Sequence, residues 1–213
     1  MIKKEIYNKI NITIIEFLCI NKVGINKLGL DVLKFYIKKF VSKTAEDTDV
    51  SFLPPMARRK LSALDKTALC VMEECLKSCE HDKQNIKIVF ASQYGELDRL
   101  KKLVAQYSQE NEVSPATFSA SVHNSAVGQF SLLKKITQSY NSVSAEEDTF
   151  SAGLTEAVIT AKDCDVLYCY CDAVTPEKAV GFACIISTCG QTNAKLKDNK
   201  LYYISQGVEK CIF

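Results

Sequence analysis

Apolar residues along the chain form two kinds of pattern, short continuous runs and stripes at helical spacing. The runs are rich in β-branched residues, for example IKIVFAS at 86–92 and DVLYCYCD at 165–172, and each predicts a strand. A strand that is apolar on both faces is typical of a sheet covered on both sides. The strands predicted in this way lie at 10–20, 86–92, near Val143, and at 165–172, 181–188 and 201–205.

Apolar residues three or four positions apart predict the helices between these strands. The longest stripe follows Pro54 and Pro55 and consists of Leu61, Leu64, Ala68, Val71, Cys75 and Leu76. The helices predicted from such stripes lie at 28–40, 57–79, 95–107, 124–136 and 152–161. Strands that alternate with helices indicate an α/β layered fold. No stretch has the composition of a linker, so we expect a single domain over residues 1–213.

Composition excludes several classes of protein. Of the 213 residues, 47% are hydrophobic and 24% charged, which is typical of a globular protein. The net charge of +2 gives no electrostatic reason to expect nucleic acid as a partner. The first apolar stretch is interrupted by Glu5, Asn8, Asn11 and Glu16, unlike a signal peptide, and no run approaches the ~20 residues that span a bilayer. We therefore expect a cytoplasmic protein.

Cysteine is unusually frequent, with ten residues in the chain. Most of them lie inside apolar periodic segments, where a free cysteine behaves as a small buried hydrophobe. No C-x-x-C occurs, and only His81 and His123 could complete a zinc site. Neither a G-x-G-x-x-G nor a P-loop pattern is present. The sequence therefore predicts reduced cysteines, no metal and no cofactor.

Candidate chemistry is concentrated where a predicted short strand leads into the small-residue helix at 152–161. Ser151 lies at this junction, within DTFSAGL at 148–154. A hydroxyl at a helix N-terminus is close to free backbone N–H groups that favour an oxyanion, as in a nucleophile elbow. The alternative is that Ser151 caps the helix, which is the commoner role of such a serine.

Two further groups of polar residues precede predicted helices. His123 follows a serine-rich stretch at the start of the helix predicted at 124–136, and a histidine in such a place is more often structural than catalytic. Arg58, Arg59 and Lys60 lie at the start of the helix predicted at 57–79, the end that the helix dipole disfavours for cations. Either a partner or solvent would have to compensate their charge.

Four segments together resemble the beta-ketoacyl synthase-like N-terminal domain family, the short ketosynthase chain length factor-like proteins of aryl polyene-type clusters. They are FLPPMARRKLSALDKTAL, IVFASQYGELDRL, SPATFSASVHNSAVGQFSL and EEDTFSAGLTEA, in order from Phe52 to about Ser187. The resemblance implies a thiolase-like α/β fold, a mixed sheet of five strands covered by helices. A complete subunit of that fold contains two such halves, and this chain has the length of about one.

The resemblance also implies where the reacting residues would lie. The Cys of a D-T-A-C-type motif falls on Ser151, or on Phe150 if the alignment slips by one residue. The catalytic histidines of a ketosynthase belong to the second half of the fold, and His123 corresponds to neither. Residues 119–132 correspond to a region near the dimer interface and acyl tunnel. The residues expected to line that interface or tunnel are Phe118, Val122, His123, Asn124, Val127, Gly128, Phe130 and Phe150. The alternative is that Phe118, Val127 and Phe130 fill the core of this chain.

Three functions follow as hypotheses. The first is a non-catalytic subunit that pairs with a full beta-ketoacyl synthase in fatty acid, polyketide or aryl polyene biosynthesis and shapes its acyl tunnel. The second is an acyl transferase or hydrolase with Ser151 as nucleophile and His123 as base. The third is a homodimer that binds acyl groups or acyl carrier protein, with Arg58, Arg59 and Lys60 facing the acidic carrier.

Overall fold

The computed structural model describes residues 33–77, 85–162, 164–187 and 189–213. These residues belong to two compact units, a larger one over residues 35–191 and a smaller one whose described part is residues 33–34 and 192–213. Each unit is described by itself, and the expectation of a single domain stays a prediction. The strand predicted at 10–20, together with Cys79 and His81, lies outside the described residues.

A mixed sheet organises the larger unit, as the sequence predicts. Its strands follow the order β3-β2-β4-β5-β1; β2 is parallel to β3 and β4, whereas β5 is antiparallel to β4 and β1. The strands are β1 (Leu33–Thr44), β2 (Lys87–Ala91), β3 (Tyr140–Val143), β4 (Val166–Ala173) and β5 (Ala179–Ser187). The α/β fold class and the predicted strands at 86–92, 165–172 and 181–188 are thereby confirmed.

The smaller unit adds three strands, so that the described chain has eight where the resemblance implies five. They are β6 (Ala194–Lys197), β7 (Lys200–Ser205) and β8 (Val208–Cys211), paired as an antiparallel meander. Two-residue turns join them, and all four turn residues, Asp198, Asn199, Gln206 and Gly207, have positive φ. This is the backbone that tight hairpins require. The sequence predicts β7 but not its two neighbours.

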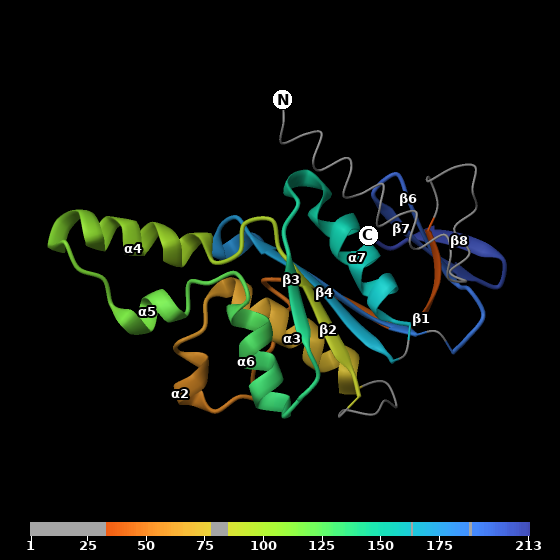
Figure 1. Ribbon diagram of the computed structural model, residues 1–213, viewed down its shortest axis with the longest axis horizontal. Coiled ribbons are helices and arrows are strands. Elements are labelled where there is room, and N and C mark those ends of the chain that lie inside the picture. Colours follow the sequence, from red (N-terminus) through yellow and green to blue (C-terminus); the bar gives the residue numbers. More distant parts are fainter. Residues whose placement is uncertain (1–32, 78–84, 163, 188) are drawn as a thin grey trace. The chain divides into compact units, whose positions relative to one another are not determined.

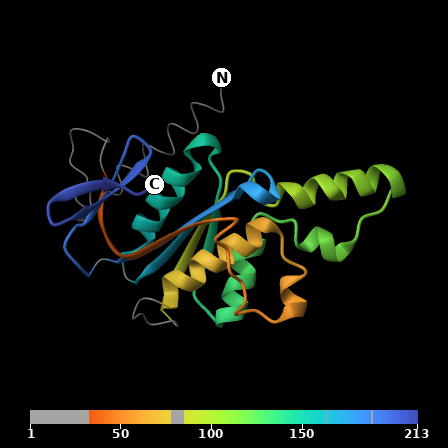
Figure 2. The ribbon, with the colours of Figure 1, turned by 180° about the vertical axis from the view of Figure 1, so that it is seen from behind.

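Helices cover both faces of the sheet in the larger unit (Figures 1 and 2). One face carries α3 (Ala63–Lys77) and α6 (Ser125–Lys134), and the other carries α7 (Thr149–Thr160). Two helices, α4 (Leu97–Glu110) and α5 (Pro115–Ser119), project away from the sheet. The remaining pieces are α2 (Pro55–Arg58) and the single turns η1 (Glu146–Asp148) and η2 (Pro176–Lys178).

Alternation along the central strands explains why both faces are apolar. On β4, Leu167 and Cys169 belong to the core beneath α3, whereas Tyr168 points to the opposite face, beneath α7.

A Cβ added at Gly153 of α7 would lie 2.6 Å from Ala91 Cβ, so the helix approaches β2 too closely for any larger residue. Burial raises the pKa of the Cys169 thiol, which stays neutral and acts as an apolar side chain.

The helix predicted at 28–40 is wrong for its described part, which is strand β1. Phe35 and Ile37 are both buried and are two positions apart, as residues on one face of a strand are. A β-bulge between Ile37 and Lys39 inserts one extra residue, and Phe40 comes three positions after Ile37. The bulge thus separates the apolar residues Ile37 and Phe40 by three positions, and this spacing resembles that of a helix.

The helix predicted at 57–79 is interrupted before Ala63, where α3 begins. Ser62 Oγ accepts a hydrogen bond from the Asp65 backbone N–H at 2.9 Å, and Asp65 Oδ2 accepts one from the Ser62 N–H at 3.2 Å. This reciprocal capping box fixes the helix start. Arg58 consequently lies in the last turn of α2, not at the beginning of a long helix.

Candidate functional site

Ser151 lies in the first turn of α7, which η1 connects to the short strand β3. Its Oγ donates a hydrogen bond to the Asp148 carbonyl oxygen at 3.0 Å. Asp148 occupies the N-cap position, so the alternative that Ser151 caps the helix is wrong. A nucleophile elbow holds its residue on a sharp strained turn between strand and helix. Ser151 instead has helical backbone and follows a turn of 3-10 helix.

Phe150, the neighbouring residue, belongs to the core of the larger unit. It is 7% exposed, and its ring contacts the rings of Tyr168, Tyr170 and Phe182 edge-on at centroid distances of 5.5–5.7 Å. The Tyr168 hydroxyl donates to the Phe150 carbonyl oxygen at 2.6 Å. These contacts anchor the first turn of α7 to the sheet.

His123 lies between α5 and α6 and packs on the loop that follows β2. Its Nε2 is 2.7 Å from the Ser92 carbonyl oxygen, and its ring approaches Gly95, whose added Cβ would be 2.9 Å from His123 Cδ2. Asp172, at the end of β4, shapes the same loop: it accepts hydrogen bonds from Ser92 Oγ at 2.7 Å and from the N–H groups of Gln93 and Tyr94 at 3.0 Å. The imidazole thus contacts this loop, while the Ser151 hydroxyl bonds within its own helix turn.

The residues expected at an interface or tunnel divide into surface and core. Phe118 is 60% exposed and Val122 42%, and Asn124 is also exposed. Val127 and Phe130 are fully buried among the core residues beneath α3, so for these two the alternative of a core role holds in this chain. Gly128 is half-buried and faces Tyr140.

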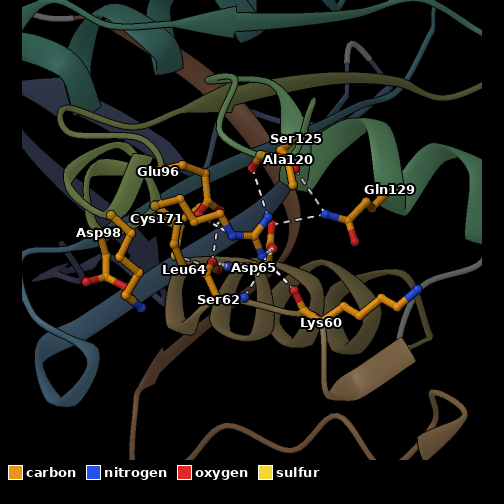
Figure 3. Close-up of polar contacts among 12 residues, drawn as sticks. Lys60, Ser62, Leu64, Asp65, Glu96, Asp98, Ala120, Ser125, Gln129 and Cys171 are labelled. Atoms are coloured by element: carbon orange, nitrogen blue, oxygen red, sulfur yellow. Dashed lines mark hydrogen bonds and ion pairs between the residues drawn. The ribbon is translucent and has the colours of Figure 1, made fainter. Parts of the chain in front are cut away.

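A buried polar cluster joins α3 to the beginning of α4. We call its members Asp65, Glu96 and Arg99 the polar junction, and Figure 3 shows the two acidic side chains converging with neighbouring residues. Arg99 Nη2 lies 2.6 Å from Asp65 Oδ2, and Arg99 Nε lies 3.2 Å from Glu96 Oε2. Arg99 also donates to the backbone carbonyls of Lys60 and Ala120, both at 2.8 Å. The guanidinium therefore links three chain segments, which are the one with Lys60 and Asp65, the one with Glu96 and the one with Ala120.

Glu96 is the unusual member of the polar junction. Burial, and next the nearby Asp65 carboxylate, raise the pKa of Glu96 to about 7, although Arg99 and the Ser62 hydroxyl oppose this. Glu96 Oε1 accepts from Ser62 Oγ at 2.9 Å, while Oε2 contacts the guanidinium without hydrogen-bond geometry. The carboxylate is thus incompletely satisfied in its charged form.

A cleft of about 530 Å³ opens beside this junction, between the segment before α3 and the helices α4 and α5. Leu61 and Ala116 line it together with the basic residues Lys60 and Lys102. Of the basic run, Arg59 and Lys60 are exposed and Arg58 is half-buried. Within the described ranges, no group of three potential ligands is arranged to hold a metal ion, and no helix is long and apolar enough to cross a membrane.

Sequence reasoning missed the polar junction and Asp172. Arg99 and Glu96 occur in GELDRL, which resembles any solvated helix start, and only long-range folding buries them. A signal did exist for Asp65, because S-x-x-D before an apolar stripe is the pattern of a capping box.

Comparison with known proteins decides the family. The family model described as "Beta-ketoacyl synthase, N-terminal domain" matches residues 37–189, nearly all of the larger unit. The chain belongs to this family. No curated protein matches the chain.

Solved ketosynthase structures share the fold of this family member. One, described as a ketosynthase (ApeO) in complex with its chain length factor (ApeC) from Xenorhabdus doucetiae, is 26% identical with a TM-score of 0.61, over 73% of this chain and 79% of that one. A type II polyketide synthase acyl-carrier protein in complex with its ketosynthase gives 11% identity and a TM-score of 0.62, over 77% and 67%. The ishigamide ketosynthase/chain length factor gives 13% and 0.57, over 70% and 51%. The last two show similarity of fold alone.

We predict that Arg99→Met destabilises this ketosynthase-family chain by about 3–5 kcal/mol, because it leaves two buried acidic groups without their cation. Urea unfolding at neutral pH measures the change. Lys102→Met is the matched control, since the Lys102 pair with Asp98 is exposed and the expected loss is below about 1 kcal/mol. Equal losses in the two variants would contradict a central role for Arg99.

Proposed function

We propose that this chain is a non-catalytic ketosynthase-like subunit that pairs with a full beta-ketoacyl synthase and contributes to the wall of its acyl tunnel. The observation that carries the proposal is at the nucleophile position. The resemblance places Ser151 where an active ketosynthase has its cysteine, and the Ser151 hydroxyl bonds to Asp148. A serine needs a positioned general base to become a nucleophile. Of the two histidines, the described one, His123, has its Nε2 2.7 Å from the Ser92 carbonyl oxygen, while the Ser151 hydroxyl donates to the Asp148 carbonyl oxygen.

The exposed apolar side chains of one region support a partner. They lie on α4, on α5 and in the segments just before and just after α5, and each is at least 37% exposed: Leu100, Val104, Tyr107, Val113, Phe118 and Val122. A concentration of exposed apolar side chains is typical of protein–protein interaction sites. One structural relative is a ketosynthase bound to a chain length factor, which favours a ketosynthase as that partner. We extend the proposal to a cytoplasmic heterodimer in fatty acid, polyketide or aryl polyene biosynthesis.

Gel filtration with the ketosynthase encoded nearest to this chain tests the pairing. We expect the two proteins to co-elute as a one-to-one complex at micromolar concentration. Phe118→Asp should abolish co-elution, because it places a charge among apolar contacts. Val208→Asp is the matched control, since Val208 is also exposed but lies on β8. Separate elution of the unmodified proteins would overturn the proposal.

We also propose that acyl carrier protein docks at Arg58, Arg59 and Lys60, which lie at or just after the end of α2. A structural relative is a ketosynthase in complex with such a carrier, and carriers are acidic. Reversing the three charges to Glu should weaken carrier binding at least tenfold, measured by titration calorimetry at low salt. The same reversal at Lys195, Lys197 and Lys210 is the control. Unchanged binding in the first variant would contradict this docking site.

A further inference from the structure

The polar junction is the place where a projecting part of the molecule is attached to the covered sheet. We call residues 97–119, comprising α4, α5 and their connection, the α4–α5 arm. Only Arg99 and Leu103 of α4 are buried, so the arm has few apolar contacts to hold it. Arg99 fixes the base of α4 to Asp65 of α3 and, through the Lys60 and Ala120 carbonyls, to the segments on either side. The position of the arm therefore depends on Arg99, together with the buried Leu103.

The charges at the junction do not balance when both carboxyl groups are ionised. The side chains of Asp65 and Glu96 are 0% and 2% exposed, and both contact the single guanidinium of Arg99. Two buried carboxylates that share one cation repel each other across a medium that screens poorly. A proton on Glu96 removes that repulsion and leaves the neutral arrangement of one carboxylate and one guanidinium.

Among the residues that the structure describes, the groups that face Glu96 include no cation besides Arg99. Asp65 and the Ser62 hydroxyl approach it from the start of α3, and Gln129 reaches Asp65 from α6. Beneath it on β4, burial raises the pKa of the Cys171 thiol well above its ordinary value, so this group is neutral. On α4, Asp98 is paired with Lys102. His123 packs against Gly95, one residue away, with its Nε2 directed to the Ser92 carbonyl.

We propose that the polar junction is a proton-controlled latch, closed when Glu96 is protonated and loosened when it is not. With the proton present, Asp65 and Arg99 form a neutral pair that holds the base of α4. When the proton leaves for solvent, the Glu96 carboxylate is stabilised by moving outward into water, and this movement displaces the first turn of α4.

The direction of the pH effect follows from the raised pKa of Glu96. The closed form binds the proton more tightly than a solvated carboxyl does, so the latch is fully effective below about pH 4.5. Its contribution decreases above that pH and is lost as the pH rises through about 7. Through the latch, pH controls the position of Phe118 and the other exposed apolar residues of the arm. The consequence for partner binding rests on the proposed pairing with a ketosynthase.

Hydrogen exchange on the full chain alone tests the latch without any partner, so its outcome is independent of the proposed function. After correction for intrinsic exchange rates, the protection of the arm amides should fall about tenfold from pH 6 to pH 8, the change expected for a group with a pKa near 7. The amides of β4 and β5, in the covered sheet, should change less than twofold. Uniform pH dependence across arm and sheet would overturn the proposal.

Two variants assign the effect to Glu96. Glu96→Gln imitates the protonated form, so the pH dependence of the arm should fall below twofold; a retained tenfold change would implicate another group, such as His123, and overturn the proposal. Asp98→Asn is the matched control, an exposed carboxylate two residues away, and should keep the tenfold change. If Glu96→Gln does not fold, carboxyl carbon NMR of the unmodified chain decides: a Glu96 midpoint near 7 supports the latch, and one below 5 contradicts it.

Discussion

The guanidinium of Arg99 contacts two buried carboxyl groups and donates to two backbone carbonyls from segments that no sheet ladder connects. Sheet hydrogen bonds and the apolar core define the position of β2, β4 and β5, and the helices α3, α6 and α7 follow from the alternation of side chains on those strands. The α4–α5 arm is different, because few of its side chains are buried. Its placement depends on the Arg99 guanidinium, whose attraction to the two carboxyl groups is poorly screened because the site is buried.

In the larger unit, the residues that stabilise the fold and the exposed apolar residues available for interaction lie in different places. The turn that would carry the nucleophile in an active ketosynthase is fixed to the core by Phe150, and its Ser151 hydroxyl bonds to Asp148 within the same turn. Exposed apolar side chains, by contrast, are concentrated on the arm and the segment after it. The buried contacts thus lie in the covered sheet, and the bulky apolar residues of the arm are exposed, as the proposed pairing requires. Such a division favours a subunit that contributes surface to a shared tunnel over one that reacts.

Much of the fold could be predicted from the sequence because its strands are apolar on both faces. Strand β1 could not, since a bulge after Ile37 shifts the alternation to a helical spacing. The S-x-x-D pattern of the capping box begins at Ser62, but the apolar stripe starts before it at Leu61 and continues through it, which favours one longer helix. At the site, Val127 and Phe130 are core residues and Phe118 is exposed, while the roles that the family resemblance implies for Ser151 and Phe118 stay predictions. Arg99 and Asp172 give no local signal, because apart from Glu96 the partners named for them lie 21 to 80 residues away in the chain.

The claim that this chain contributes surface and no reacting atom is tested most directly by acyl transfer. The chain and its neighbouring ketosynthase are incubated together with acyl carrier protein thioesters, and the intact mass of each protein is measured. We expect an acyl adduct on the ketosynthase and none on this chain with any donor. An adduct on this chain that disappears in Ser151→Ala would contradict a non-catalytic role and establish Ser151 as a nucleophile.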